Sequence, residues 1–579
     1  MDLSLGKTHG GRPTVYGRNG VVASGHYLAS EIGVHILRRG GNAFDAAVAA
    51  IIVLQLTKPH QNGFAGENPT LLYCARQKKV HALSGHGPAP AAATLEHVSS
   101  LCDGLIPGDG FLPAVVPSAF GTCMYLLKTF GTLSVETVLT PALMLAVDGF
   151  AMAGDLSRTI DAVSERFRTQ WPSSAAVFLP DGEVPATGSL FSNPDFGHTL
   201  ERLIEAAAGK DRETGCTAAA DRFYRGDIAR EIVEFIGDDP CALLTLADFA
   251  AFHPALETPA SITWRGMDVV KCPTWTQGPV LLQSLNLLQS FDLEAMGHNT
   301  GKYIHTVVEA MKLAYADREF YYGDPDFSDI PLERLLDPAH AAKRAGLITD
   351  SASLELRPDG YAPLSEFGSV NDVNETVAAG PHHGDTTKLD IIDGDGNAIS
   401  ITTSGGWLQS SPIIPGLGFP LGTRGQMFSL QPGHPNCIAP GKRPRTTLTP
   451  GLALKHGEPY LAFGSPGGDG QDQWALQFLL NTELFGMDLQ EAIEAPTFWS
   501  RHWPDSFYPR KCEPGKLLLE SRIEMTVIEA LAARGHHTVR TGAYAGGNTC
   551  ACRREQTTSG VLLSAGASPR LEPAYALAY

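Results

Sequence analysis

The sequence lacks the features that mark several large classes of protein. It has no run of about 18 uncharged apolar residues, the length needed by a membrane-spanning helix. Its longest apolar stretch, residues 46–56, is too short. Acidic residues outnumber basic ones by 62 to 44, which gives a net charge of −18. The lack of a long apolar run leads us to expect no membrane span, and because an acidic surface repels phosphate backbones, we expect no nucleic-acid partner.

Signals for export and for metal binding are also missing. Residues 1–17 contain no apolar core segment and do not resemble a secretory signal. Ten cysteines are scattered along 579 residues, and the one close pair, Cys550 and Cys552, has no second pair or histidines at zinc spacing. Free thiols in a reducing compartment are the expectation. We therefore expect a cytoplasmic protein without a metal or other cofactor, unless a leader has been removed.

Common catalytic signatures are absent as well. The chain has no G-x-S-x-G nucleophile elbow, no H-E-x-x-H zinc motif, no phosphate-binding G-x-x-x-x-G-K-[ST] and no dinucleotide motif. Two pairs of adjacent histidines, at 382–383 and 536–537, would point to opposite faces of a strand and so bind one metal poorly. The chemistry of this chain has to come from other residues.

The apolar residues that are present predict a globular chain of helices and strands. Residues 20–60 predict a strand and then two helices, because apolar residues recur three and four apart and a glycine pair interrupts the repeat. Asn42 or Asp45 is expected to cap the second helix. Residues 303–322 predict a further long helix whose charged side chains fall on its other faces.

The stretch GDTTKLDIIDGDGNAIS, residues 384–400, predicts a β-hairpin. Leu389 and Ile391 alternate with Lys388 and Asp390, which predicts a strand with one buried and one solvated face. The Asp-Gly and Gly-Asn pairs that follow favour a tight hairpin turn, and a second apolar strand comes after them.

The hairpin follows a segment in which no helical or strand period holds. Ser, Pro, Asp, Gly and Asn dominate residues 347–385, and structureless segments of this length are usually functional or linkers. We expect a flexible loop that ends at Asp385-Thr386. A threonine hydroxyl needs a base to act as a nucleophile, and an N-terminal α-amine, which titrates near ~8, can be that base. Cleavage before Thr386 would give one residue both parts.

A second candidate feature is GSPGGDGQ, residues 464–471. Gly467 and Gly468 would let two backbone N–H groups approach a substrate and hold a developing oxyanion. Each feature alone also has an ordinary structural explanation, because threonine favours strands and G-S-P-G-G is usually a turn. Their meaning depends on the rest of the chain.

Five stretches together carry a resemblance to a known family. They are GGNAFDAAVAA, PHQNGFAGEN, DTTKLDIIDGDGNAISIT, KRPRTTLTP and GSPGGDGQ, and they stand in the family's order. The sequence resembles the γ-glutamyltranspeptidase family of N-terminal-nucleophile (Ntn) hydrolases over almost its whole length. The resemblance implies an α+β fold, specifically a four-layer αββα sandwich, and an enzyme that cuts itself in two.

Carried over to this chain, the resemblance makes Thr386 the nucleophile and places the cut between Asp385 and Thr386. The large subunit would be residues 1–385, including the flexible loop at 347–385, and the small subunit would be residues 386–579. The two subunits would stay together as a heterodimer, either alone or as a dimer of heterodimers.

The resemblance also assigns neighbours to the nucleophile. Ser404 falls where the family has a threonine that hydrogen-bonds the nucleophile. Gly467 and Gly468 fall on the family's oxyanion hole. Thr446 and Thr447 fall on a pair of serines that bind the substrate carboxylate.

Three substrate-binding positions depart from the family pattern. His86 replaces an arginine that binds the substrate α-carboxylate, Met427 replaces an aspartate that binds the α-ammonium, and Gly406 replaces an asparagine. Arg424 enters nearby. A closed site with an arginine and no acid disfavours an ammonium and favours an anion. A structural salt bridge is the alternative role for Arg424.

We therefore expect an autoprocessed threonine amidohydrolase that acts on a small amide whose acyl group carries a free carboxylate. The departures bring the chain closer to glutathione hydrolase-like proteins, cephalosporin (glutaryl) acylases and oxamate amidohydrolase. Two alternatives stay open. One is an authentic γ-glutamyl hydrolase or transpeptidase, in which Glu67 or another acid would bind the ammonium. The other is an uncleaved homologue that only binds a ligand. The substrate itself and the oligomeric state do not follow from the sequence.

Overall fold

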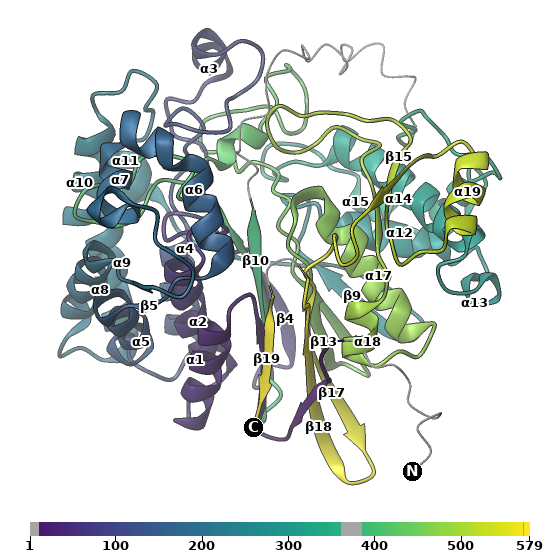
Figure 1. Ribbon diagram of the computed structural model, residues 1–579, viewed down its shortest axis with the longest axis horizontal. Helices are drawn as coiled ribbons and strands as arrows, with labels where there is room; N and C mark the ends of the chain where they lie inside the picture. Colours follow the sequence, from purple (N-terminus) through teal and green to yellow (C-terminus); the bar gives the residue numbers. More distant parts are fainter. Residues whose placement is uncertain (1–10, 361–384, 571–572) are drawn as a thin grey trace.

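The computed structural model describes residues 11–360, 385–570 and 573–579 (Figure 1). Two seven-stranded sheets lie face to face, and helices cover the outer face of each. These four layers confirm the αββα sandwich of the Ntn-hydrolase type that the sequence resemblance implied. Among the described residues, no helix combines the length and the apolar character that crossing a membrane requires.

The first sheet contains the predicted hairpin at its centre. Its strand order is β19-β2-β10-β11-β3-β4-β7, and every neighbouring pair is antiparallel. Within β10 and β11, Thr386 pairs with Ser404, so the first residue of one strand lies beside the last residue of the other. The strands are β2 (Gly20–Ser24), β3 (Thr70–Cys74), β4 (Lys79–Leu83), β7 (Leu256–Glu257), β10 (Thr386–Asp393), β11 (Ala398–Ser404) and β19 (Tyr575–Ala578).

The second sheet brings the glycine-rich stretch to the same end of the sandwich. Its order is β1-β18-β17-β13-β12-β9-β8, again antiparallel throughout. Strand β13 ends at Gly464, directly before that stretch. The strands are β1 (Val15–Gly17), β8 (Ala260–Trp264), β9 (Met267–Lys271), β12 (Gly451–Lys455), β13 (Glu458–Gly464), β17 (Cys550–Thr557) and β18 (Gly560–Ala567). Smaller sheets pair β14 (Phe498–Ser500), β15 (Lys516–Glu520) and β16 (His537–Thr541), and β5 (Phe150–Ala151) with β6 (Leu190–Phe191).

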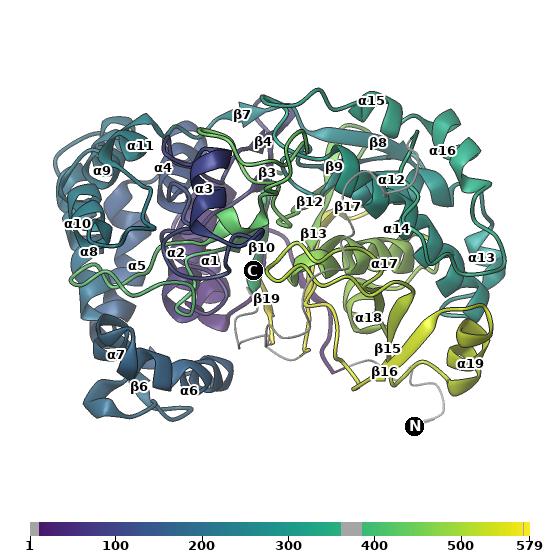
Figure 2. The same ribbon diagram turned by 90° about the horizontal axis from the view of Figure 1, so that it is seen from above.

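Different helices cover the two sheets (Figure 2). On the first sheet lie α1 (Tyr27–Arg38) and α2 (Ala43–Thr57), and beyond them a helical lobe. The lobe contains α3 (Leu95–Leu101), α4 (Ala119–Phe130), α5 (Val135–Asp148), α6 (Gly154–Thr169), α7 (Pro172–Phe178), α8 (Pro194–Ala207), α9 (Arg212–Tyr224), α10 (Asp227–Ile236) and α11 (Leu246–Ala251). On the side of the second sheet lie α12 (Pro279–Leu288), α13 (Leu293–Met296), α14 (Gly301–Tyr321), α15 (Leu332–Leu335), α16 (Pro338–Ala345), α17 (Gln471–Glu483), α18 (Leu489–Glu494) and α19 (Met525–Ala533).

Local signals place the start of α2 as predicted. The Asn42 side chain accepts hydrogen bonds from the N–H groups of Phe44 and Asp45. The Asp45 carboxylate in turn accepts from the Asn42 N–H at 2.9 Å. Both candidate caps therefore act together, as a capping box.

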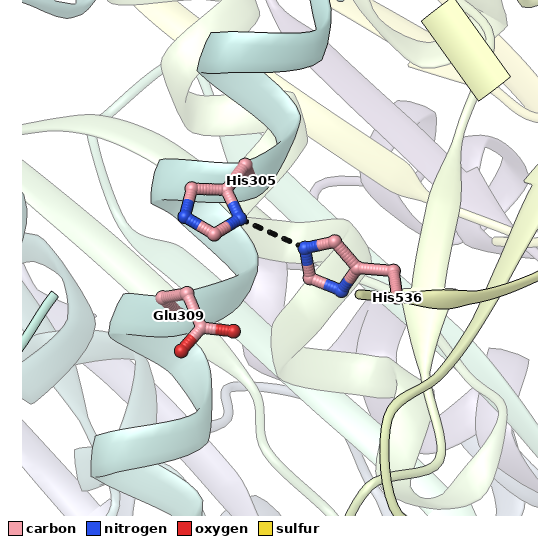
Figure 3. Close-up of side chains that lie close together, drawn as sticks. All are labelled: His305, Glu309 and His536. Atoms are coloured by element: carbon pink, nitrogen blue, oxygen red, sulfur yellow. Dashed lines mark hydrogen bonds between the residues drawn. The ribbon is translucent and has the colours of Figure 1, made fainter. Parts of the chain in front are cut away.

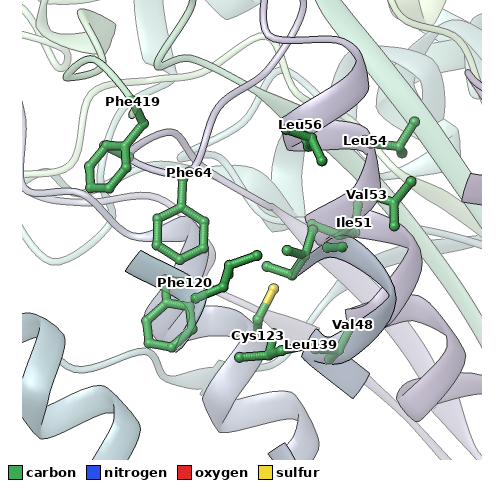
Figure 4. Close-up of a cluster of buried hydrophobic side chains, with 14 of the residues drawn as sticks. Val48, Ile51, Val53, Leu54, Leu56, Phe64, Phe120, Cys123, Leu139 and Phe419 are labelled. Carbon is green, nitrogen blue, oxygen red and sulfur yellow. The ribbon is translucent and has the colours of Figure 1, made fainter. Parts of the chain in front are cut away.

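Helix α2 is buried on all sides because it lies between the first sheet and the helical lobe. Figure 4 shows its Val48 and Ile51 beside Cys123 of α4 and Leu139 of α5. Cys123 is one of ten cysteines, and all ten are free thiols, as expected. An almost wholly apolar helix at this position fixes the first sheet against a rigid support.

The prediction that β10 has one solvated face is wrong. Lys388 and Asp390 are 1% and 0% exposed, because β10 lies between α2 and the second sheet. Their charged groups pair at 2.6 Å, and Lys388 also donates to Ser400 on β11 at 2.8 Å. Burial raises the pKa of Asp390 to about 6. The alternation in the sequence therefore marks a buried ion pair and not a surface.

Residues 347–360, the described part of the predicted loop, contain no helix or strand but are held in place. The carbonyl group of Thr349 contacts the His305 ring at 2.7 Å. The carbonyl group of Ser353 accepts from Lys312 at 2.9 Å. The rest of the predicted loop, residues 361–384, lies outside the described residues.

We predict that Lys388→Met lowers the free energy of unfolding by about 3 kcal/mol at pH 8, since breaking a buried ion pair typically costs ~3–5 kcal/mol. The loss should be smaller at pH 5. Asp390 has a raised pKa in the folded state, and once protonated it needs no cation. Urea unfolding measures both values. The double variant Lys388→Met/Asp390→Asn should recover part of the stability, and an unchanged single variant would contradict the prediction.

Candidate active site

Thr386 and Ser404 form the centre of the site, at the paired ends of β10 and β11. Thr386 is 1% exposed, and its Oγ1 donates to Ser404 Oγ at 3.3 Å. Its backbone N–H donates to the Asp385 carboxylate at 2.7 Å. While the peptide bond to Asp385 is intact, the Thr386 nitrogen is an amide and cannot take up a proton.

Ser404 connects the threonine to the peptide bond that precedes it. Its Oγ accepts from Arg424 Nη2 at 2.7 Å and lies 2.7 Å from the Asp385 carbonyl oxygen. A guanidinium has only donors, and the Thr386 hydroxyl already donates to Ser404. The proton of Ser404 therefore points to the Asp385 carbonyl oxygen. The indole Nε1 of Trp407 donates to the same oxygen at 2.8 Å.

Arg424 is completely buried and forms an ion pair with Glu67. Its Nε bonds to the Glu67 carboxylate, whereas its Nη1 lies 3.6 Å from the thioether sulfur of Met427. Burial raises the pKa of Glu67, and the charge of Arg424 acts in the opposite direction. The salt bridge that the sequence offered as the alternative role of Arg424 is therefore present. Among the described residues, its Nη1 is paired with a weak acceptor, the Met427 sulfur.

A glycine turn after β11 places the Trp407 side chain. Gly405 and Gly406 have φ values of +72° and +60°, which side chains rarely adopt. A Cβ atom at Gly406 would lie 3.0 Å from the backbone nitrogen of Gly66, and one at Gly63 would lie 2.0 Å from the Gly406 carbonyl oxygen. Gly406 therefore lies close against the Gly63 and Gly66 backbone, and a side chain at position 406 would be a tight contact.

Gly467 lies beside the candidate nucleophile. A cavity of about 150 Å³ is lined by Asp385, Thr386 and Gly467, among others. A second cavity of about 280 Å³ has both Gly467 and Gly468 in its wall, next to Trp474. Gly467 and Gly468 have φ values of +113° and +53°, at the start of the 3₁₀ turn η5 (Gly468–Gly470). This left-handed backbone suits glycine and leaves the walls free of Cβ atoms.

Thr446 and Thr447 lie along the same side of the site. The carbonyl oxygen of Thr446 accepts from the Gln277 N–H at 2.9 Å. The Gln277 side chain donates to the Gly468 carbonyl oxygen at 3.4 Å, which links the threonine pair to the glycine pair. Thr447 is 1% exposed, and its hydroxyl has no hydrogen-bond partner among the described residues. Buried hydroxyls usually have a partner, so the Thr447 hydroxyl is an exception in this interior.

His86 is buried and carries no charge near neutral pH. Its ring packs on Trp275 at 4.8 Å between centroids, and its Nε2 lies 2.9 Å from the Pro444 carbonyl oxygen. Burial and, to a smaller extent, the charge of Arg443 lower the pKa of His86 to about 3. His86 therefore does not supply the positive charge of the arginine that it replaces.

His305, Glu309 and His536 offer three ligand atoms within 4.8 Å of one another (Figure 3). The two histidine rings contact each other at 2.9 Å. Glu309 already pairs with Lys312 at 2.7 Å and with Arg357 at 3.0 Å. Two cations on one carboxylate disfavour a third positive charge there. Burial also lowers the pKa of both histidines, so the two rings carry no charge near neutral pH.

Three further residues at the site were not identified from the sequence as binding or catalytic groups. Gln61 donates from its side chain to the Asp385 carboxylate at 3.1 Å. Phe507 and Trp407 place their ring centroids 5.5 and 5.3 Å from the guanidinium carbon of Arg424. Gln61 belongs to the matching stretch PHQNGFAGEN, which was a usable signal. No motif pointed to Trp407 or Phe507.

We predict that Glu67→Gln lowers the free energy of unfolding by about 3 kcal/mol, because it leaves Arg424 buried without its counter-ion and such losses cost ~3–5 kcal/mol. Chemical denaturation of the variant measures the loss. Glu31→Gln is the control, since Glu31 is exposed and its change should stay within ~0.5 kcal/mol. Equal stability of the two variants would show that the ion pair does not hold this region.

Comparison with known proteins shows to which family the chain belongs. The chain matches the profile described as Gamma-glutamyltranspeptidase over residues 29–578. It is 32% identical to the glutathione hydrolase-like YwrD proenzyme of Bacillus subtilis (strain 168) over 92% of this chain and 93% of that protein. The solved structure of LmbA2991HD is 43% identical, with a TM-score of 0.91 over 98% of this chain and 99% of that one. The crystal structure of cephalosporin acylase from Bacillus halodurans is 30% identical, with a TM-score of 0.84 over 98% and 97%. The protein therefore belongs to the γ-glutamyltranspeptidase family and is an Ntn-type amide hydrolase.

Proposed function

We propose that this protein cuts itself between Asp385 and Thr386 and that Thr386 then becomes the nucleophile of an amidohydrolase. The observation that carries the proposal is the position of Thr386. Its hydroxyl donates to Ser404, and Ser404 contacts the carbonyl group of the peptide bond to be cut. The relative YwrD, named a proenzyme, supports such processing.

Once cut, Thr386 supplies both nucleophile and base. Its free α-amine takes the proton from Oγ1, and Oγ1 attacks the carbonyl carbon of the substrate amide. The N–H groups of Gly467 and Gly468 hold the resulting oxyanion. The C–N bond then breaks, the proton passes to the departing amine, and the acyl group stays on Thr386 as an ester. Water hydrolyses this ester and regenerates the free threonine, while Ser404 orients the hydroxyl.

Two subunits made by this cut, residues 1–385 and 386–579, would remain one body. Strand β10 of the small subunit pairs with β2 of the large one, and β11 pairs with β3. In the second sheet, β12 pairs with β9. Each sheet thus has strands from both subunits, so separating them would break the central hydrogen bonds of both sheets.

We further infer that the substrate is a small amide whose acyl group carries a carboxylate and no α-ammonium. His86 is neutral, and Met427 offers no charge to an ammonium. In the described part of the chain, Arg424 Nη1 bonds to a thioether, and the Thr447 hydroxyl has no hydrogen-bond partner. Both groups can donate to a carboxylate. The similarity to a cephalosporin acylase supports an acyl amide of this kind.

A γ-glutamyl hydrolase or transpeptidase is the second candidate, and one observation favours it. Glu67 is an acid beside the candidate nucleophile's partner Ser404. The Glu67 carboxylate is paired with Arg424. It could therefore bind a substrate ammonium only while it also stays bonded to the guanidinium of Arg424. An uncleaved protein that only binds a ligand is the third candidate, and it differs from both by remaining a single chain.

We predict that the purified protein consists of two chains, about two thirds and one third of the mass, and that the smaller begins with the sequence TTKLD. Thr386→Ala should give one chain without amidase activity, because it removes the hydroxyl that attacks in both reactions. Thr387→Ala is the matched control and should still be cut. Denaturing gels and N-terminal sequencing measure this, and an active wild-type protein that stays in one piece would refute the proposal.

We predict that the cut enzyme has a higher kcat/KM for glutaryl p-nitroanilide than for γ-glutamyl p-nitroanilide. Met427→Asp should shift the ratio toward the γ-glutamyl compound by about tenfold or more, because a hydrogen bond between charged groups is worth ~1.5–3 kcal/mol. Met427→Asn is the neutral control. Glutathione and oxamate are assayed alongside. A wild-type preference for the γ-glutamyl compound would favour the second candidate.

A further inference from the structure

The carbonyl oxygen of Asp385 accepts two hydrogen bonds inside the protein. Ser404 Oγ lies 2.7 Å from it, and Trp407 Nε1 lies 2.8 Å from it. Ser404 and Trp407 are 0% and 2% exposed, so both donors act away from bulk water. This oxygen belongs to the peptide bond whose cutting is proposed above.

We propose that Trp407 is a catalytic residue of the self-cutting step, in which its indole N–H stabilises the negative charge that develops on the Asp385 oxygen. This inference rests on the proposed function, since it concerns the same peptide bond. Two donors aimed at a carbonyl oxygen make up an oxyanion hole, and they act most strongly where water is excluded. An indole N–H is a donor only, so it cannot compete for the threonine proton.

The atoms of the step balance without an added reactant other than water. Thr386 Oγ1 forms a bond to the Asp385 carbonyl carbon, which leaves the negative charge on the Asp385 oxygen beside Ser404 and Trp407. The proton of the threonine hydroxyl passes by way of Ser404 to the nitrogen of Thr386. Collapse re-forms the carbonyl group and breaks the C–N bond, and the protonated nitrogen leaves as the free amine. The product is an ester, which water hydrolyses to the Asp385 carboxylate and a free threonine.

These donors serve a different carbonyl group from the glycine pair. Gly467 lines the cavity beside Thr386, where the carbonyl group of a substrate has room. Ser404 and Trp407 already hold the carbonyl group that belongs to the chain itself. The protein thus has one pair of donors for cutting itself and another for turnover.

The surroundings of Trp407 fix its N–H toward Asp385. The left-handed turn at Gly405 and Gly406 comes directly before Trp407, whose indole Nε1 lies 2.8 Å from the Asp385 carbonyl oxygen. The Arg424 guanidinium stands 5.3 Å from the ring centroid. The guanidinium is attracted to the face of the indole ring. Its positive charge also favours negative charge on the Asp385 oxygen, which lies at the N–H edge of that ring.

A second acceptor explains how the donor is satisfied after the cut. Trp407 Nε1 also donates to the Gln61 carbonyl oxygen, at 2.9 Å. When Asp385 becomes a carboxylate and leaves, the indole N–H keeps this partner and is not left buried and unpaired. The shared hydrogen bond therefore allows one side chain to act in processing without disturbing the mature site.

The test compares Trp407→Phe with the wild type during processing. Freshly translated protein is followed on denaturing gels as the full-length chain converts into two. The variant should convert at least about 100-fold more slowly, as loss of one oxyanion donor does in other enzymes. Trp275→Phe is the matched control, because Trp275 is also buried and donates its indole N–H at 2.8 Å, but to Glu257. It should convert at the wild-type rate.

Hydroxylamine separates the chemical steps, which a merely structural defect would not do. It cleaves the ester once formed, so it should not restore the rate if Trp407→Phe slows ester formation. Restoration to the wild-type rate, or a wild-type rate without hydroxylamine, would overturn the inference.

If the phenylalanine variant does not fold, site-specific β-(3-benzothienyl)alanine at position 407 replaces the N–H by sulfur in a ring of the same shape. The same slow conversion is expected, and normal conversion overturns the inference. A wild type that is not cut at Thr386 refutes the proposed function instead.

Discussion

The buried ion pair between Arg424 and Glu67 is the contact on which the rest of the site depends. It joins the segment before β3 to the 3₁₀ turn η4 (Arg424–Met427), 357 positions away in the sequence. Neither charge is stable in the interior without the other, so the pair fixes both segments at once. Glu67 also exchanges backbone hydrogen bonds with Ser404, at 2.9 and 3.1 Å. Through these bonds the position of Ser404, and with it that of Thr386, follows from the ion pair.

The direction of the hydrogen bonds follows from the same pair. A guanidinium offers only donors, so Ser404 must accept from Arg424 and direct its own proton elsewhere. The Asp385 carbonyl oxygen receives that proton. A lysine at position 424 would rotate freely and fix this direction less well, whereas the planar fork of arginine holds it. The chemistry around Thr386 is therefore set by a residue that need not touch the reacting atoms.

Charge also explains why this pocket differs from the pattern of its family. Burial makes His86 neutral, and Met427 contributes no charge. The positive charge of Arg424 is paired with the Glu67 carboxylate. Gly406 packs closely against the Gly66 backbone and lacks the amide side chain expected there. Each departure removes a group suited to an amino acid substrate, which is the basis of the substrate class proposed above.

The sequence by itself determined the local structure and the identity of the candidate nucleophile. The capping box at Asn42 and the hairpin of β10 and β11 depend on residues a few positions apart, so the linear pattern contains them. Thr386 was identifiable because the loss of a regular pattern before it and the strand after it are both linear features, and the family motifs supported the choice.

Only the tertiary structure decided whether each face of a strand contacts water, a helix or the other sheet. Alternation shows which side chains share a face, but not whether that face meets water or a second sheet, and so Lys388 and Asp390 were misassigned. The partner of Arg424 and the target of Trp407 depend on contacts between distant segments, which buried charges and glycine packing select in three dimensions.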